Sequence, residues 1–142
     1  FLVLVMIVGP GLIVNSVFKQ NWGRPRPRDL VEFSGGKPYV MVWDKRSPDG
    51  GNSFASGHAS TGFYLFTPFF FLRRRSKYWA LFFLASGLGY GSLIGLARII
   101  QGAHFLSDVV WAGGFVYLSG LAFFYLLRPD RECAGSIKQR AV

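Results

Sequence analysis

Apolar residues along this chain are gathered into four long runs separated by polar segments. The runs cover residues 1–18, 54–72, 78–97 and 105–127. A helix rises about 1.5 Å per residue, so a run of about 18 or more residues reaches across most of a hydrocarbon core of roughly 30 Å. The pattern therefore predicts an all-α, polytopic membrane helix bundle with four spans.

The first run is interrupted by Gly9, Pro10 and Gly11. Neighbouring helices can satisfy the backbone groups that a proline leaves free in a membrane, whereas lipid alone cannot. The run lacks the basic start of a signal peptide, and the chain begins inside it at Phe1 without an initiator Met. We therefore expect a membrane helix here and further helices N-terminal to it in the natural protein.

The polar connections predict the topology. They are a long loop over 19–53 that is rich in Gly, Pro, Asp and Arg, a basic turn at 73–77, a short turn at 98–104 and a polar tail at 129–142. In four alternating spans, the long loop and the short turn share one side of the membrane, and the basic turn and the tail share the other. We expect one membrane domain over 1–128, followed by a disordered cytoplasmic tail.

Composition agrees with a membrane protein. Hydrophobic residues make up 51% of the chain, and charged residues only 16% against about 25% in soluble domains. The net charge of +9 falls in blocks between apolar runs, which favours a membrane lipid over nucleic acid as the partner. The single Cys133 excludes an internal disulfide and a cysteine metal cluster. Nothing in the sequence indicates whether the protein is a monomer or an oligomer.

Three clusters of polar residues, all on the side of the long loop, have the chemistry of a phosphate site. In the first, Lys19 is followed after six residues by Arg26, which precedes Pro27. A guanidinium offers a planar fork to two phosphate oxygens, and an ammonium adds a compact charge. The alternative is that these cations, with Arg24 and Arg28, only bind lipid headgroups at the interface.

Ser56, Gly57 and His58 form the second cluster, where the long loop becomes the second apolar run. The N-terminus of a helix attracts an anion, Gly57 allows close approach of the backbone, and Ser56 can cap the helix. His58 is then within reach of a bound phosphate. The alternative is an N-cap with an incidental interfacial histidine.

Arg98, His104 and Asp108 form the third cluster. His104 and Asp108 are four residues apart and share a face if the helix has begun by Ala103. The carboxylate can then hold one imidazole N–H, so that the other ring nitrogen presents its lone pair as a nucleophile. Asp108 also lies in an apolar span, where an ionisable side chain is usually functional. A capping or interhelical pair is the alternative.

A metal site is a competing interpretation, because His58, His104 and Asp108 could supply two histidines and one carboxylate. The three cations of the clusters oppose it, since they would repel a divalent cation and attract an oxyanion. We therefore expect neither a metal nor another cofactor.

Together the clusters resemble the signature motifs of the type 2 phosphatidic acid phosphatase superfamily, in order and in internal spacing, over residues 19–108. The resemblance implies metal-independent hydrolysis of a phosphate ester through a phosphohistidine intermediate. His104 would be the nucleophile, Asp108 would orient it, and His58 would protonate the leaving group. The phosphate would be bound by five further residues, Lys19, Arg26, Ser56, Gly57 and Arg98.

Two positions depart from the family pattern. Ala55 stands where proline commonly precedes the Ser-Gly-His motif, and Ala97 stands where serine commonly precedes the arginine. Neither position supplies charge or a proton, so we expect activity to be kept. Membrane members of the family usually have six spans, so the four predicted here imply a missing N-terminal pair.

The expected substrate is a lipid phosphate whose hydrophobic anchor stays in the bilayer, with residues 19–53 as the lid that selects the headgroup. Residues 23–27 resemble bacterial members that act on lipid A. Phosphatidylglycerophosphate, phosphatidate and polyprenyl pyrophosphate are further candidates. The alternative functions are phosphate transfer to another lipid and non-catalytic binding of an anion or lipid headgroup.

Positive charge predicts the orientation. Eight Lys and Arg lie on each side of the predicted membrane domain, and setting aside the three in the phosphate clusters leaves five against eight. The basic turn carries four of the eight next to two spans. By the positive-inside rule we expect this turn to be cytoplasmic and the site to face the extracytoplasmic side. The resemblance to bacterial members implies that the membrane is a bacterial inner membrane.

Three features predict how the helices pack, bend and sit in the membrane. Gly87, Gly91 and Gly95 recur every four residues and indicate a face for close helix packing. Pro68 predicts a kink in the second run, and Trp79 an interfacial anchor for the third.

Overall fold

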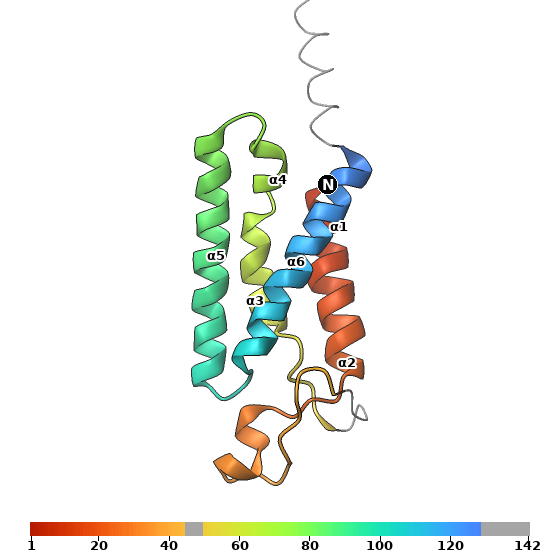
Figure 1. Cartoon of the computed structure of the whole chain (residues 1–142), viewed down its shortest axis with the longest axis vertical. Coiled ribbons are helices and arrows are strands. Elements are labelled where there is room, and N and C mark those ends of the chain that lie inside the picture. The colour runs from red at the N-terminus through yellow and green to blue at the C-terminus, as the bar shows by residue number, and fades with distance from the viewer. Residues whose placement is uncertain (45–49, 129–142) are drawn as a thin grey trace, which may run out of the picture.

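The computed structural model describes residues 1–44 and 50–128, and within that part the chain is a bundle of helices (Figure 1). Three helices are long and apolar enough to cross a membrane: Leu2–Asn21, Lys77–Ile100 (α5) and Leu106–Leu127 (α6). Among the described residues, β pairing is limited to one isolated bridge in the long loop. The predicted all-α membrane bundle is confirmed. Cys133 and the polar tail lie outside the described residues.

The first long helix continues through the Gly-Pro-Gly interruption by changing its winding. It begins as α1 (Leu2–Met6), becomes the π-helix η1 (Ile7–Phe18) and ends as α2 (Lys19–Asn21), three residues beyond the predicted end of the run. Asn15 donates its side-chain N–H to the carbonyl of Pro10 at 2.7 Å. The wider turns accommodate the missing N–H of proline, and packing of η1 against α6 supports this stretch.

The second apolar run differs from the predicted continuous span, because it is divided into short helices. It contains α3 (Gly57–Phe63), the 3₁₀ turn η5 (Tyr64–Phe66) and α4 (Phe69–Leu72). Thr67 donates its hydroxyl to the carbonyl of Tyr64 at 2.6 Å, and Pro68 offers no N–H to continue the ladder. The predicted kink at Pro68 is therefore present as a break, and the bundle has three long helices and one segmented one.

The predicted glycine face on α5 is confirmed as a packing surface. Gly87, Gly91 and Gly95 are buried. A side chain at Gly87 would meet the backbone of Phe66, and one at Gly91 would meet the ring of Phe63. The absence of side chains thus lets the segmented helix lie directly against α5.

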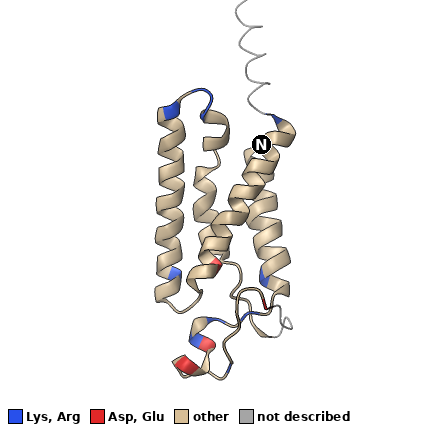
Figure 2. Ribbon diagram, in the orientation of Figure 1, with Lys and Arg blue, Asp and Glu red and all other residues tan. Residues whose placement is uncertain are grey.

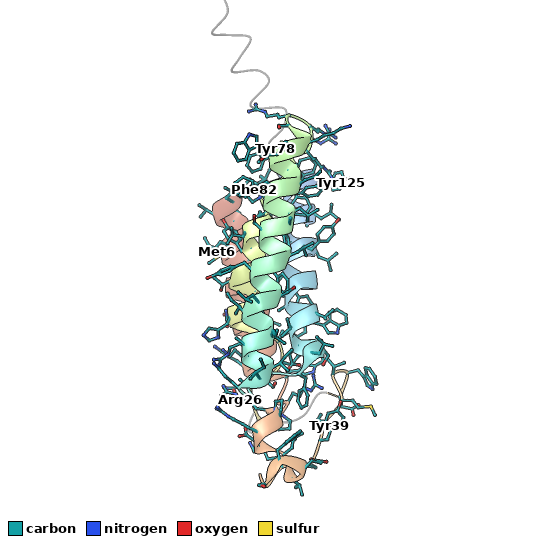
Figure 3. All side chains as sticks on the ribbon, turned by 90° about the vertical axis from the view of Figure 1, so that its left-hand side faces the viewer. Met6, Arg26, Tyr39, Tyr78, Phe82 and Tyr125 are labelled. Atoms are coloured by element: carbon teal, nitrogen blue, oxygen red, sulfur yellow. The ribbon has the colours of Figure 1, made fainter. Side chains whose placement is uncertain are left out.

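The long loop and the 98–104 turn lie at the same end of the bundle, as the topology predicts (Figure 1). The basic turn and the end of α6 lie at the opposite end, so that Lys and Arg mark both ends (Figure 2). The side view shows Arg26 and Tyr39 at the loop end and Tyr78 at the other (Figure 3). The three clusters therefore converge on one end of the molecule.

Two short 3₁₀ turns, η2 (Pro27–Asp29) and η3 (Val31–Phe33), fold the loop back under the helices. The Arg28 N–H donates to the carbonyl of Gly102 at 3.0 Å, which docks the loop on the turn between α5 and α6. Gly102 has a φ of +61°, a left-handed conformation that glycine adopts without strain.

Candidate active site

The second cluster starts α3 in the way that its sequence predicts. Ser56 is the N-cap, and its hydroxyl oxygen accepts the Ala59 N–H at 3.4 Å. The Ser56 N–H donates to the carbonyl of Asp108 at 3.2 Å, which joins the start of α3 to the first turn of α6. His58 lies in the first turn of α3 and is exposed, so its ring is free to meet a ligand from outside the bundle.

His104 lies between α5 and α6 and is only 2% exposed. Its Nδ1 atom is 2.7 Å from the backbone carbonyl oxygen of Ser53. Because a carbonyl can only accept, Nδ1 carries the proton, and Nε2 of the neutral ring holds the lone pair. The ring is thus held in the tautomer that a nucleophilic histidine needs.

The partner of His104 differs from the one that we predicted. Asp108 Oδ2 is 3.8 Å from His104 Nδ1, which is beyond hydrogen-bond distance. The predicted direct bond between the two side chains is therefore not made, because the Ser53 carbonyl occupies the Nδ1 position. The carboxylate is still near enough to stabilise a positive charge on the imidazole ring.

Asp108 is fully buried, and its carboxylate is surrounded by donors. Oδ1 pairs with Arg24 Nη1 at 2.5 Å. Oδ2 accepts the Ser53 hydroxyl at 2.5 Å and the Phe105 N–H at 2.9 Å. These bonds explain how a charged residue is accommodated in the first turn of a membrane helix.

Arg24 is 1% exposed, so the alternative that it binds headgroups at the interface is wrong for this residue. Its Nε donates to the Val40 carbonyl at 3.0 Å, and its Nη1 also donates to the Ser107 hydroxyl at 2.8 Å. The guanidinium carbon lies 4.1 Å from the centre of the Phe105 ring. The sequence contained one signal for this role, since the buried Asp108 requires a cationic partner.

The three predicted phosphate-binding cations lie close to one another. Lys19 is within electrostatic reach of Arg26 and Arg98, and His58 is within reach of Lys19, Arg98 and His104. The Nε–H groups of Arg26 and Arg98 are buried, and neither has an acceptor in the described part of the chain. Such donors, gathered around positive charge, fit an oxyanion that accepts from them.

A pocket of about 220 Å³ opens at the junction of the first helix and α3. It is lined by Asn15, Lys19, Gly57, His58 and Thr61. A Cβ atom at Gly57 would collide with the Asn15 side chain, so glycine is needed for this close approach. Asn15 was not a predicted site residue, because nothing in the sequence distinguishes it from other polar residues of an interfacial helix.

Metal ligation was the competing interpretation of the two histidines and Asp108. Across residues 1–44 and 50–128, no three His, Cys, Asp or Glu side chains are grouped so that they could hold a metal ion. Asp108 is instead engaged by Arg24 and Ser53.

The fold defines the class as integral membrane helix bundles, and this one gathers three cations and two histidines at one end. The family comparison is more specific, because the model of the PAP2 superfamily matches residues 1–132. This chain belongs to that superfamily, which confirms the resemblance that the three motifs carry.

Three curated relatives share the name lipid A 4'-phosphatase. The one from Francisella tularensis subsp. novicida is 41% identical over 136 residues, covering 93% of this chain and 59% of the relative. Those from Rhizobium leguminosarum and Rhizobium etli are 34% and 33% identical, over 82% of this chain and 50% and 45% of the relatives. The chain thus spans about half the length of the curated relatives that it matches. No solved structure matches it.

Proposed function

We propose that this chain carries the active site of a metal-independent phosphatase that removes a phosphate from a membrane lipid, with lipid A as the first candidate substrate. The observation that supports this proposal most directly is the buried imidazole of His104, whose Nδ1 lies 2.7 Å from the Ser53 carbonyl, so that the neutral ring would present its lone pair at Nε2. The lipid A phosphatases among the relatives support the choice of substrate.

In the first step, His104 Nε2 attacks phosphorus, and an N–P bond forms as the bond from phosphorus to the lipid oxygen breaks. His58 donates a proton to that oxygen, which leaves as an alcohol. Lys19, Arg26 and Arg98 offset the negative charge on the other phosphate oxygens, as positioned cations do in phosphoryl transfer. The nearby Asp108 carboxylate stabilises the positive charge that develops on the His104 ring.

In the second step, water attacks phosphorus and the N–P bond breaks. His58 takes a proton from the water, inorganic phosphate leaves, and the lone pair returns to His104 Nε2. A second lipid alcohol in place of water would make the same site a phosphotransferase. No cofactor or metal takes part in either step.

The proposed site lies at the membrane surface, which suits a substrate whose acyl chains remain in the bilayer. The described loop residues, 22–44 and 50–53, lie at this end and include the exposed aromatic residues Tyr39 and Trp43, which could contact a headgroup. We propose that the loop selects among lipid phosphates. The other candidates are phosphatidylglycerophosphate, phosphatidate and polyprenyl pyrophosphate.

The function is tested by phosphate release from lipid A and from phosphatidate by the purified chain, compared with its His104→Asn variant. Asparagine can keep a donor near the Ser53 carbonyl but lacks the nucleophile, so release should fall to background while the thermal unfolding temperature stays close to the unmutated value. Acid-labile, base-stable label from ³²P-lipid should be trapped on the unmutated protein alone.

Activity should also withstand EDTA and be inhibited by vanadate, which occupies an oxyanion site. Absence of phosphate release by the unmutated chain would favour the non-catalytic anion-binding alternative. Loss of activity with EDTA would instead indicate a metal enzyme. Labelled phosphate appearing on a lipid alcohol, with little free phosphate, would identify a phosphotransferase.

A further inference from the structure

The network behind His104 contains two residues that none of the three sequence motifs includes as a site residue. Ser53 and Arg24 are both buried, with exposed fractions of 0% and 1%. Neither lines the pocket that contains His58. Both contact Asp108, and Ser53 also contacts His104.

Ser53 bridges the histidine and the carboxylate through two different groups. Its carbonyl oxygen is 2.7 Å from His104 Nδ1, and its hydroxyl donates to Asp108 Oδ2 at 2.5 Å. The direct distance from His104 Nδ1 to Asp108 Oδ2 is 3.8 Å. The carboxylate and the imidazole are therefore linked by two separate hydrogen bonds to one residue, Ser53.

Arg24 fixes the other side of the carboxylate. It pairs with Asp108 Oδ1, while its Nε bond to Val40 and its position over the Phe105 ring prevent the guanidinium from turning away. A buried carboxylate without this cation would be strongly disfavoured as an anion. The Ser53 N–H, in turn, donates to the Arg24 carbonyl at 2.9 Å, so the two residues also hold each other's backbone.

We infer that Ser53 and Arg24 are positioning residues for His104: Arg24 holds Asp108 as an ion, and Asp108 holds the Ser53 residue whose carbonyl orients the imidazole. This inference rests on the proposed function for its kinetic consequences. Both residues act through His104 and Asp108 rather than on the phosphate. Their loss is therefore expected to slow the reaction without weakening the binding of phosphate.

Ser53→Ala removes the hydroxyl and keeps the carbonyl, and Ser53→Thr restores a hydroxyl. The alanine variant should lower kcat about 10- to 100-fold, the loss expected when a hydrogen bond to a charged group disappears, with KM nearly unchanged. The threonine variant should recover most of this loss. The Ki of inorganic phosphate as a competitive inhibitor should stay constant in both.

Ser119→Ala is the matched control, since Ser119 is a buried serine of α6 whose hydroxyl bonds to the Phe115 carbonyl of its own helix. It should keep the kcat of the unmutated chain. For Arg24, the lysine variant keeps the charge and the methionine variant removes it. Arg24→Lys should therefore retain more kcat than Arg24→Met, at equal Ki for phosphate.

A measurement independent of turnover uses ¹⁵N-histidine labelling, since the chain has two histidines and His58→Gln assigns their signals. His104 should show a protonated, hydrogen-bonded Nδ1, and this signal should shift in Ser53→Ala and Arg24→Met but not in Ser119→Ala. If the chain were inactive but showed these shifts, the proposed function would be refuted and the positioning of His104 by Ser53 and Arg24 would stand. An active chain in which Ser53→Ala leaves kcat and the ¹⁵N signal unchanged, or raises KM and Ki instead, would overturn the positioning inference.

Discussion

At the scale of single residues, the two histidines occupy opposite environments. His104 is buried between α5 and α6, whereas His58 is exposed on the first turn of α3 and lines the pocket. A nucleophile benefits from a fixed ring, while a proton donor must exchange protons with solvent between turnovers. The burial of each ring therefore matches the role proposed for it.

His58→Gln should lower kcat for a lipid phosphate by about 10²- to 10⁴-fold, because the leaving alkoxide then lacks a proton donor. The loss should be much smaller for p-nitrophenyl phosphate, whose phenolate leaves readily without protonation. Steady-state kinetics with both substrates makes the comparison.

His104→Asn serves as the control for that comparison, since loss of the nucleophile should abolish turnover of either substrate. If His58→Gln slowed both substrates by the same factor, His58 would not act as the acid.

The sequence predicts the role of a residue when that role depends on its neighbours along the chain, and not when it depends on contacts that only the fold creates. Ser56 as an N-cap follows from neighbouring residues and is confirmed. Arg24 could not be separated from Arg26 and Arg28 by sequence, because alternate positions in a loop say nothing about which side chain is buried. The role of the Ser53 carbonyl could not be predicted either. Every residue has a backbone carbonyl, and only the fold determines which one lies next to His104.

At the scale of helices, the segmented second span depends on α5 for support. Its short pieces cannot be stable alone, because a helix of a few residues lacks enough internal hydrogen bonds to offset its nucleation. Phe63 and Phe66 of this span lie directly against the glycine face of α5. Since α3 also carries His58, the packing of α5 holds one side of the site.

Gly87→Ala should destabilise the protein by about 1–3 kcal/mol, because the added methyl group meets the Phe66 backbone, which cannot turn aside as a side chain would. Gly89→Ala is the matched control two residues away, where a Cβ atom meets nothing within 4 Å. Unfolding of both variants in detergent, followed by circular dichroism, measures the difference. Equal stability of the two variants would show that close packing at Gly87 is unimportant.

Helix prediction succeeded where apolar length alone decides the outcome, as in α5 and α6. It was less accurate over 54–72, where the structure has short helices instead of one continuous helix. There the Thr67 hydroxyl bonds to the backbone, and Pro68 has no N–H to donate to the helix. The helix predicted across Pro10 is present, because a π-helix accommodates the proline and packing against α6 supports it. Proline thus marks a place of altered winding, and its neighbours decide whether the helix breaks.

At the scale of the whole molecule, Lys and Arg lie at both ends of the helix bundle (Figure 2). The basic turn and the C-terminal end of α6 lie at the end away from the long loop (Figure 2). Lys19, Arg26 and Arg98, the proposed phosphate-binding residues, lie at the other end, near His58. Because the three cations at the site end have a proposed role in binding phosphate, the basic turn is the better guide to orientation. This supports the proposed orientation, with the basic turn in the cytoplasm and the site outside.

In a Cys133→Ser background, a cysteine at the exposed loop position Glu32 should react with a membrane-impermeant maleimide in intact cells. A cysteine at Ser76 in the basic turn should react only after the membrane is permeabilised. Both positions lie outside the long helices. Labelling of Ser76→Cys alone in intact cells would reverse the proposed orientation.

The ion pair between Arg24 and Asp108 joins residues 84 positions apart in the chain. Ribosomes release a membrane protein from its N-terminus onward, so Arg24 is made long before its counter-ion. Until α6 has been inserted, the guanidinium lacks this carboxylate and His104 lacks its neighbour. Closure of the pair therefore requires that synthesis has passed Asp108 in the first turn of α6, and a ribosome-stalled fragment ending before α6 would lack the ion pair that supports the proposed nucleophile.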